Sequence, residues 1–214
     1  MLNGEQKLLH KEGVIRLQLE SRPEQRLTAG DFMPMAAKLN LVAPIDLGVA
    51  DMAIKRLREE QSEIAINISS EVIADFNFRR ELLGLLKNAS DVCPRLLLEA
   101  PEYGVFRQYE AFRDLTSKLK DVGCRVGIEY FGQRFAESDQ LTSLGLDYIK
   151  VHPGYVRGIT DNTGNQEFLQ GLCRMAHNLG MQAIAVGVDS PEEISMLISL
   201  GFDGVTGPGV KQSA

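Results

Sequence analysis

The fold is decided between residues 95 and 152, where the chain reads RLLLEA at 95–100, RVGIEY at 125–130 and DYIKVH at 147–152. Each run is short and mostly apolar, which is typical of a strand buried on both faces of a parallel sheet. Each run also carries a charged residue near its end, and amphipathic segments separate the runs. This order predicts buried strands that alternate with covering helices.

The same pattern continues toward both termini. Runs of this kind occur at 11–19 (KEGVIRLQL), 62–69 (SEIAINIS), 182–188 (QAIAVGV) and, weakly, 203–207 (DGVTG). The amphipathic segments between the runs lie at 31–41, 45–60, 71–87, 103–120, 137–145, 165–180 and 190–201. Seven strands with helices after most of them favour an α/β fold of the TIM-like (β/α) barrel type over a doubly wound sheet. No GxGxxG or GxxxxGK[ST] motif follows a strand, which argues against a dinucleotide or P-loop site.

Composition restricts the class of protein further. The 214 residues are 44% hydrophobic and 24% charged, with a net charge of −6. These values predict one globular domain over residues 1–214 and no partner among DNA or RNA polymers, although a small anionic nucleotide in a local pocket is allowed. Three cysteines lie far apart among apolar residues, at Cys93, Cys124 and Cys173. We interpret them as reduced, buried thiols, which favours a cytoplasmic location.

Polar residues gather where the apolar runs end. In a (β/α) barrel the carboxyl ends of the strands converge on one mouth, where function is located. The residues in question are Glu12, Asn67, Glu99, Glu129, Lys150 and Asp189. Burying charged groups among strand hydrophobes is costly unless they are paired or bind a metal. The pattern therefore predicts a site of carboxylates, an amide and a lysine, and leaves open that these groups are solvated at the rim or form buried ion pairs.

Eight segments resemble, in order, the motifs of the EAL-domain family. In the first half, KEGVIRL resembles the EALLR strand, residues 27–46 resemble L-x-P-x-x-F-I-P-x-A-E-x-x-G-L-I, INISS resembles NLS, and LLLEAPE resembles LELTE. In the second half, VGIEYFGQ resembles IALDDFGTG, LDYIKVHPGYV resembles VDYLKIDRSFV, AIAVGVDS resembles VIAEGVE, and FDGVTGPGV resembles CDxxQGYLF. The resemblance covers nearly the whole chain and implies an EAL-type barrel.

EAL domains hydrolyse cyclic di-GMP with two Mg²⁺ or Mn²⁺ ions, so the resemblance implies roles for individual residues. Carried over by motif, the ligands of one residual metal site are Glu12, Asn67, Glu99 and Glu129, the vestigial catalytic residues are Lys150 and Glu102, and the ligand-binding residues are Arg16, Lys150 and Asp189. Arg16 takes the place of the family arginine that contacts a ligand phosphate, a role that suits a guanidinium.

Four positions depart from the family pattern. Tyr130 replaces the second Asp of DDFG, Val186 the Glu of AEGVE, His152 the Asp of KID and Thr206 the Gln of QGY. A two-metal clamp stabilises both the attacking and the leaving oxygen, and Val186 offers no oxygen ligand. We therefore expect negligible hydrolysis, with Mg²⁺ or Mn²⁺ allowed at one site but not required.

Three functional hypotheses follow. The first is a degenerate EAL domain that acts as a non-catalytic cyclic di-GMP receptor, and FMPMA and DGVTGPGV are similar to LapD-type receptor domains, which would add further signalling domains and place the chain on the cytosolic side of a membrane-bound protein. The second is a protein-interaction module that binds no nucleotide, and the third is a weak phosphodiesterase. A homodimer is compatible with each of them.

The family resemblance also implies a strand of the YQPIVDL kind before the EAL strand. Residues 1–10 do not resemble it. We therefore expect a barrel that lacks its first strand, either trimmed at its N-terminus from a longer signalling protein, which we favour, or divergent with seven strands.

Overall fold

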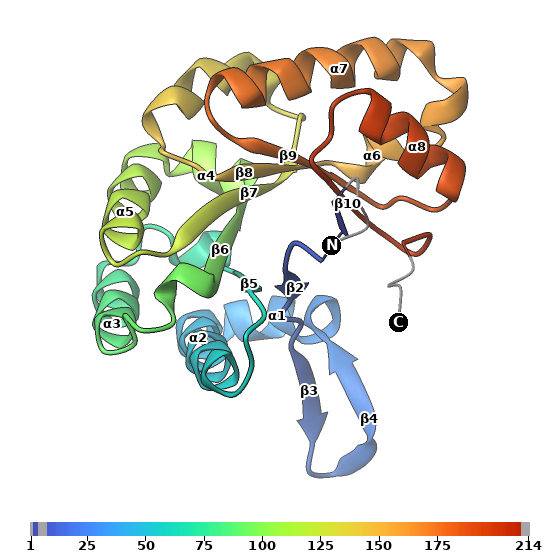
Figure 1. Cartoon of the computed structure of the whole chain (residues 1–214). Coiled ribbons are helices and arrows are strands. Elements are labelled where there is room, and N and C mark those ends of the chain that lie inside the picture. Colours follow the sequence, from blue (N-terminus) through green and yellow to red (C-terminus); the bar gives the residue numbers. More distant parts are fainter. Residues whose placement is uncertain (1, 4–7, 211–214) are drawn as a thin grey trace.

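The computed structural model describes residues 2–3 and 8–210, and its centre is one curled sheet (Figure 1). Seven strands run parallel in the order β2, β5, β6, β7, β8, β9 and β10. They are β2 (Lys11–Glu12), β5 (Ile64–Asn67), β6 (Leu96–Pro101), β7 (Arg125–Phe131), β8 (Tyr148–Val151), β9 (Gln182–Val186) and β10 (Gly204–Thr206). All seven predicted runs contribute a strand, so the α/β barrel-like architecture is confirmed.

Helices cover the outside of this sheet, as Figure 1 shows. They are α1 (Ala29–Lys38), α2 (Val42–Glu59), α3 (Phe76–Lys87), α4 (Glu102–Arg107), α5 (Tyr109–Asp121), α6 (Pro153–Val156), α7 (Thr163–Asn178) and α8 (Pro191–Ser199). Short 3-10 helices complete the connections: η1 (Ser70–Val72), η2 (Cys93–Arg95), η3 (Phe135–Ser143) and η4 (Ile159–Asp161). Among the residues described, no helix is both long and apolar enough to cross a membrane. The three cysteines are free and buried, as expected.

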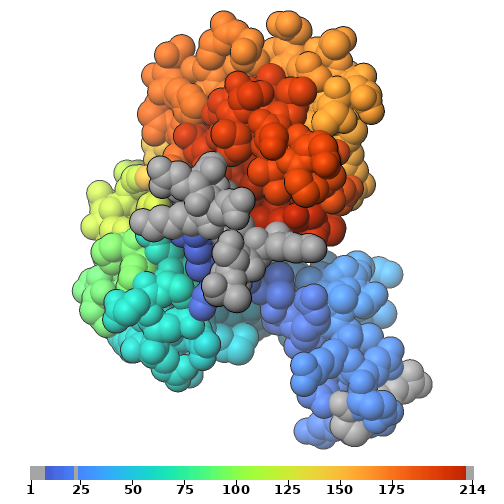
Figure 2. All heavy atoms as spheres, turned by 45° about the vertical axis from the view of Figure 1, so that its right-hand side comes forward, coloured from blue at the N-terminus to red at the C-terminus, as the bar shows by residue number. Residues whose placement is uncertain are grey.

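The first run of the sequence does not form one long strand. Only Lys11–Glu12 joins the sheet, and the chain then leaves it to form the antiparallel hairpin of β3 (Arg16–Leu19) and β4 (Arg22–Thr28). All four residues of β3 are exposed, so its apolar side chains do not enter the core. Figure 2 shows the hairpin and α1 as a lobe that stands out from the rest of the molecule.

Among the described residues the parallel sheet has seven strands, as expected for a barrel without its first strand. A two-residue strand that was not predicted, β1 (Leu2–Asn3), lies antiparallel to β10 at the far end of the sheet order. It lies outside the seven predicted runs because two residues give no measurable periodicity. Residues 1 and 4–7 lie outside the described part of the chain.

Strand alternation divides the inner face of the sheet into two layers. Side chains two residues apart on a strand point to the same side. The lower layer is mostly apolar: Ala65, Leu97, Tyr148 and Ile184 form a core cluster separate from the large one beneath the helices. Two residues further along their strands lie Asn67, Glu99, Lys150 and Val186. The alternation thus places the predicted polar residues directly above an apolar floor.

Gly127 makes room for the largest side chain in this floor. A Cβ atom on Gly127 would overlap the ring of Tyr148 on the neighbouring strand, and that ring is fully buried. We predict that Gly127→Ala lowers the free energy of unfolding by about 1–3 kcal/mol, because the ring cannot move away without straining its surroundings. Gly171→Ala is the matched control. Gly171 lies in the middle of α7, and a Cβ atom there would meet nothing within 4 Å. Alanine is the better helix former, so this variant should raise the free energy of unfolding by roughly 0.5–1 kcal/mol. Urea denaturation measures both values, and a neutral Gly127→Ala would contradict this packing.

Candidate functional site

The mouth of the barrel is organised around one buried lysine. Lys150, on β8, is 1% exposed, and its Nζ donates hydrogen bonds to Glu12 Oε1 at 3.0 Å, Glu99 Oε2 at 2.5 Å and Glu129 Oε1 at 3.1 Å. These carboxylates come from β2, β6 and β7. Four predicted residues from four different strands are therefore in contact. They form ion pairs with one another, which is one of the alternatives that the sequence analysis left open.

Burial and neighbouring charges have opposite effects on the pKa values of Glu99 and Lys150. Burial raises the pKa of Glu99 to about 8, although the Lys150 ammonium opposes the shift. Burial also acts to lower the pKa of Lys150, but the three carboxylates more than offset it and the pKa ends above its usual range. Both directions reduce the excess negative charge of three carboxylates around one ammonium: a raised pKa favours a bound proton on Glu99 and keeps Lys150 charged.

Two further residues touch Glu99 from below. The Tyr148 hydroxyl donates to Glu99 Oε1 at 2.6 Å, and His10 Nε2 lies 3.8 Å from the same oxygen. Burial, with the nearby Lys150 charge, lowers the pKa of His10 to about 3, so the imidazole is neutral and the contact is not an ion pair at neutral pH. Neither residue was predicted; Tyr148 stands in the sequence as an ordinary strand aromatic.

Glu102 is placed differently from the other predicted residues. It is buried at the start of α4, and its carboxylate accepts hydrogen bonds from the backbone N–H groups of Gly132, Gln133 and Arg134, between 2.9 and 3.2 Å. It therefore holds the loop that follows β7. In this structure Glu102 positions the segment after Tyr130, and its predicted vestigial catalytic role remains a prediction.

Arg16 and Asn67 line one cavity of about 160 Å³, where the start of the hairpin meets helices α1 and α2. Asp46 and Ser69 also line it, and the remaining lining residues are Gly13 and mostly apolar side chains: Val14, Ile15, Ala29, Met33, Ile45 and Val49. Within the described part of the chain, the exposed guanidinium of Arg16 donates a hydrogen bond to Ile15 O at 2.9 Å, and a guanidinium has five N–H donors in all. Asp46 Oδ2 accepts from the Ser69 N–H at 2.7 Å and Oδ1 from the Ser69 hydroxyl at 3.1 Å. Helix α2 thereby fixes the end of the strand that carries Asn67.

The remaining predicted positions lie around the rim. Asp189 is exposed after β9, 4.0 Å from Arg157 Nε. Val186 ends β9 half-buried, opposite Thr206 of β10. Tyr130 has a left-handed backbone, with φ of +58°, a conformation in which Asp is several-fold enriched and an aromatic residue is rare. Its ring centroid lies 6.0 Å from that of His152.

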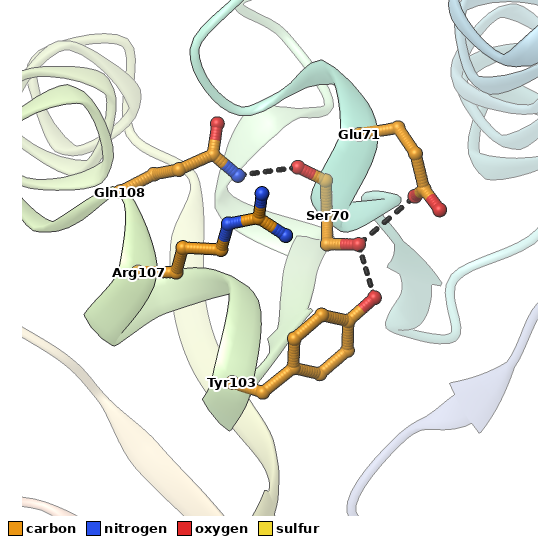
Figure 3. Close-up of a pocket in the computed structure, with 5 residues that line it drawn as sticks. All are labelled: Ser70, Glu71, Tyr103, Arg107 and Gln108. Atoms are coloured by element: carbon orange, nitrogen blue, oxygen red, sulfur yellow. Dashed lines mark hydrogen bonds between the residues drawn. The ribbon is translucent and has the colours of Figure 1, made fainter.

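A second cavity, of about 430 Å³, opens beside the ends of β5 and β6 (Figure 3). Ser70 forms hydrogen bonds there with Glu71, at 2.9 Å, and with the Tyr103 hydroxyl. The Gln108 amide bonds to the backbone of Ser70 and Ala74, and the Arg107 side chain extends into the space between these groups. This cavity was not predicted, because its residues lie on η1, on α4 and just after α4, outside the apolar runs.

Comparison with known proteins decides the family. The family model of the EAL domain matches residues 5–212. The chain belongs to the EAL-domain family. Cyclic di-GMP phosphodiesterase PdeF of Escherichia coli K12 is 23% identical over 198 residues, which is 90% of this chain and 26% of PdeF. This EAL domain therefore spans about a quarter of the length of that curated relative.

Solved structures agree with the fold. The apo S helix-GGDEF-EAL structure of Vibrio cholerae LapD superposes with a TM-score of 0.90 at 22% identity, covering 98% of this chain and 51% of that one. The EAL domain of Xanthomonas citri FimX in complex with c-diGMP gives 0.86 at 25% identity, covering 96% and 82%. LapD is also the protein whose type FMPMA and DGVTGPGV resemble in the sequence.

The residues at the mouth do not fit the metal centre that the resemblance implied. Val186 and Tyr130 stand where two carboxylates would be needed, and the Lys150 ammonium is bound by three of the four expected ligands. Among the described residues, no group of three or more His, Cys, Asp or Glu side chains is arranged to hold a metal ion.

The contact between the buried Asp46 of α2 and Ser69, just after β5, can be tested through its pH dependence. Burial raises the pKa of Asp46 from 3.8 to about 6. Between these two values, the carboxyl group is mostly protonated in the folded protein and mostly ionised in the unfolded chain. The wild type therefore loses stability as the pH rises through this window. Relative to wild type, Asp46→Asn should gain about 1–3 kcal/mol between pH 4 and 7. Denaturant titrations across this range measure the gain, with the exposed Asp51→Asn of the same helix as control; equal behaviour of the two variants would contradict the assignment.

Proposed function

We propose that this EAL domain is a degenerate, non-catalytic receptor for cyclic di-GMP. The single observation that carries the proposal is the exposed guanidinium of Arg16, which lines a cavity that also includes Asn67, the residue in register with Glu99 on the neighbouring strand. A guanidinium binds phosphate oxygens through paired, charge-assisted hydrogen bonds. The FimX relative, at 25% identity, was solved in complex with c-diGMP, which supports the same ligand here.

The absence of hydrolysis follows from the groups at positions 130 and 186. Cleavage of a phosphodiester needs an activated water and neutralisation of charge at the attacking and leaving oxygens. Val186 offers no oxygen, and burial raises the pKa of the Tyr130 phenol, which keeps it protonated. Glu99 and Glu129 are both hydrogen-bonded to Lys150, so neither is free to activate a water.

Binding would then depend on the rim rather than on the interior. Lys150 lies beneath the carboxylates with each of its three N–H groups directed at one of them. It reduces the negative charge that a phosphate would meet, while Arg16 and backbone N–H groups make the direct contacts. Asp189, exposed on the other side of the mouth, is available to accept hydrogen bonds from a base.

The wider context is part of the proposal. The quarter-length match to PdeF fits a regulatory domain joined to further signalling domains, located in the cytoplasm or on the cytosolic side of a membrane-bound protein. The alternative is a protein-interaction module without nucleotide. It is favoured by the exposed apolar side chains of the lobe, among them Val14, Met35 and Leu39. Nucleotide binding separates the two.

We predict that the chain forms no linear pGpG at rates of order 1 s⁻¹, the ordinary enzyme range, with either Mg²⁺ or Mn²⁺. The double variant Tyr130→Asp with Val186→Glu should recover some activity, because it restores two carboxylates and because Asp tolerates the left-handed backbone at 130. Each single variant should recover little. Chromatography of the product measures this, and wild-type turnover in the ordinary range would refute the non-catalytic assignment.

We further predict that Arg16→Ala weakens cyclic di-GMP binding about ten- to a hundredfold, since a charge-assisted contact contributes roughly 1.5–3 kcal/mol. Calorimetry with and without Mg²⁺ measures the change. Arg26→Ala removes the same charge from the paired strand of the hairpin and is the matched control. If the wild type gives no binding heat at high micromolar cyclic di-GMP, the protein-interaction module is favoured. If Arg16→Ala and Arg26→Ala lose the same affinity, Arg16 contributes only its charge and makes no specific contact.

A further inference from the structure

The cavity of about 430 Å³ beside η1 and α4 contains two opposite charges, those of Arg107 and Glu71 (Figure 3). Within the described part of the chain, neither charge forms an ion pair. The volume falls within the range of about 300–1,000 Å³ that is usual for small-molecule sites. The cavity shares no lining residue with the one that Arg16 and Asn67 line, so it is a separate candidate site.

The wall of this cavity is held in place by contacts within the protein. A Cβ atom on Gly104 would lie 2.7 Å from Ser70 Cβ, so glycine lets α4 approach η1 closely at this point. The Gln108 amide donates a hydrogen bond to Ser70 O at 2.6 Å and accepts one from the Ala74 N–H at 3.0 Å. These contacts fix the start of η1 and the chain just after it, so the lining groups are positioned before a ligand arrives.

The hydrogen bonds of Ser70 determine what one side of the cavity offers to a ligand. The Ser70 hydroxyl has a single proton, which it donates to Glu71 Oε2 at 2.9 Å. Its contact with the Tyr103 hydroxyl therefore requires Tyr103 to be the donor. Both hydroxyl protons are then engaged, so the Tyr103 oxygen and Glu71 Oε1 can only accept further hydrogen bonds. This side of the cavity suits a positively charged donor.

Arg107 gives the other side of the cavity the opposite character. Figure 3 shows its guanidinium on the far side of Ser70 from the Glu71 carboxylate. A guanidinium has five N–H donors and no acceptor, and no hydrogen bond joins this one to another side chain among the described residues. A carboxylate binds such a group through two parallel, charge-assisted hydrogen bonds. An occupant that satisfies both sides therefore carries a carboxylate and an ammonium group.

We propose that this cavity binds a free α-amino acid, with its carboxylate on Arg107 and its ammonium group on Glu71 and the Tyr103 hydroxyl oxygen. Both charged groups of an α-amino acid are attached to one carbon atom, so one small molecule matches both sides. The Tyr103 ring is 52% exposed and offers an apolar surface to the amino-acid side chain. A ligand with only one of the two charges would leave either Arg107 or Glu71 without a partner.

Amide NMR spectra of the whole chain, recorded with each standard L-amino acid and without nucleotide, test the proposal. We expect at least one amino acid to give saturable shifts of the Ala74 and Gln108 signals at millimolar concentration or below. Its α-hydroxy acid, which lacks the ammonium group, and its α-carboxamide, which lacks the carboxylate, should each bind about tenfold more weakly. Because no nucleotide is present, the result does not depend on the proposed receptor function.

Two variants locate the site. Arg107→Gln and Glu71→Gln each remove one charge and keep a polar side chain, and we expect each to weaken binding about tenfold. Both side chains are exposed, so the fold should tolerate the changes. Arg113→Gln and Glu110→Gln are the matched controls, because these residues of α5 pair with each other and do not line the cavity. The controls should keep the wild-type affinity.

Three results would overturn the proposal. The first is the lack of a saturable shift with every amino acid up to about 10 mM, since binding weaker than this is not specific enough to define a site. The second is equal binding of the amino acid and either of its two analogues, because one of the charges would then have no role. The third is an equal loss of affinity in the cavity variants and in their α5 controls.

Discussion

One buried ammonium group determines how the mouth of this barrel is built. Carboxylates brought from three strands around one nitrogen atom repel one another, and the repulsion is strongest at the buried Glu99. Lys150 neutralises part of that charge, and the raised pKa of Glu99 reduces it further by favouring a bound proton. The Tyr148 hydroxyl completes the coordination of Glu99 from the apolar floor. The arrangement of the side chains at the mouth therefore depends on a few atoms, those of Lys150, its three carboxylates and the Tyr148 hydroxyl.

Much of this arrangement could be predicted from the sequence. Continuous apolar runs determined the seven parallel strands, and the period of two residues within each run put Glu99, Glu129 and Lys150 on one face. What the runs do not encode is the partner of each polar group. Whether Lys150 meets a carboxylate or a ligand depends on distances between strands, which emerge only when the sheet curls. The pairing of Glu102 with the backbone after β7 is of the same kind, since backbone N–H groups leave no mark in a sequence.

The hairpin is the clearest departure from expectation. KEGVIRLQL has the composition of a strand throughout, yet only its first two residues enter the sheet. Gly13 lies against Ile66 and the backbone of Ala65, and after that close approach the chain turns outward. Residues Arg16–Leu19 keep their extended conformation by pairing with β4 instead of with the sheet. Local β propensity was right about the conformation, and it carries no information about which strand becomes the neighbour.

Tyr148 has a consequence for the topology of the interior space. Its ring fills the barrel under Gly127, and on the amino side of the sheet it borders a cavity of about 280 Å³ that also contacts His10 and Arg125. The ring is the largest member of the apolar layer that it forms with Ala65, Leu97 and Ile184. This layer lies between the cavity on the amino side and the carboxylates bound to Lys150, so the two ends of the sheet's interior are kept in different surroundings, one lined by His10 and Arg125 and the other by the ion pairs. A smaller residue at position 148 would thin the layer at its widest point and let water from the amino side approach Glu99.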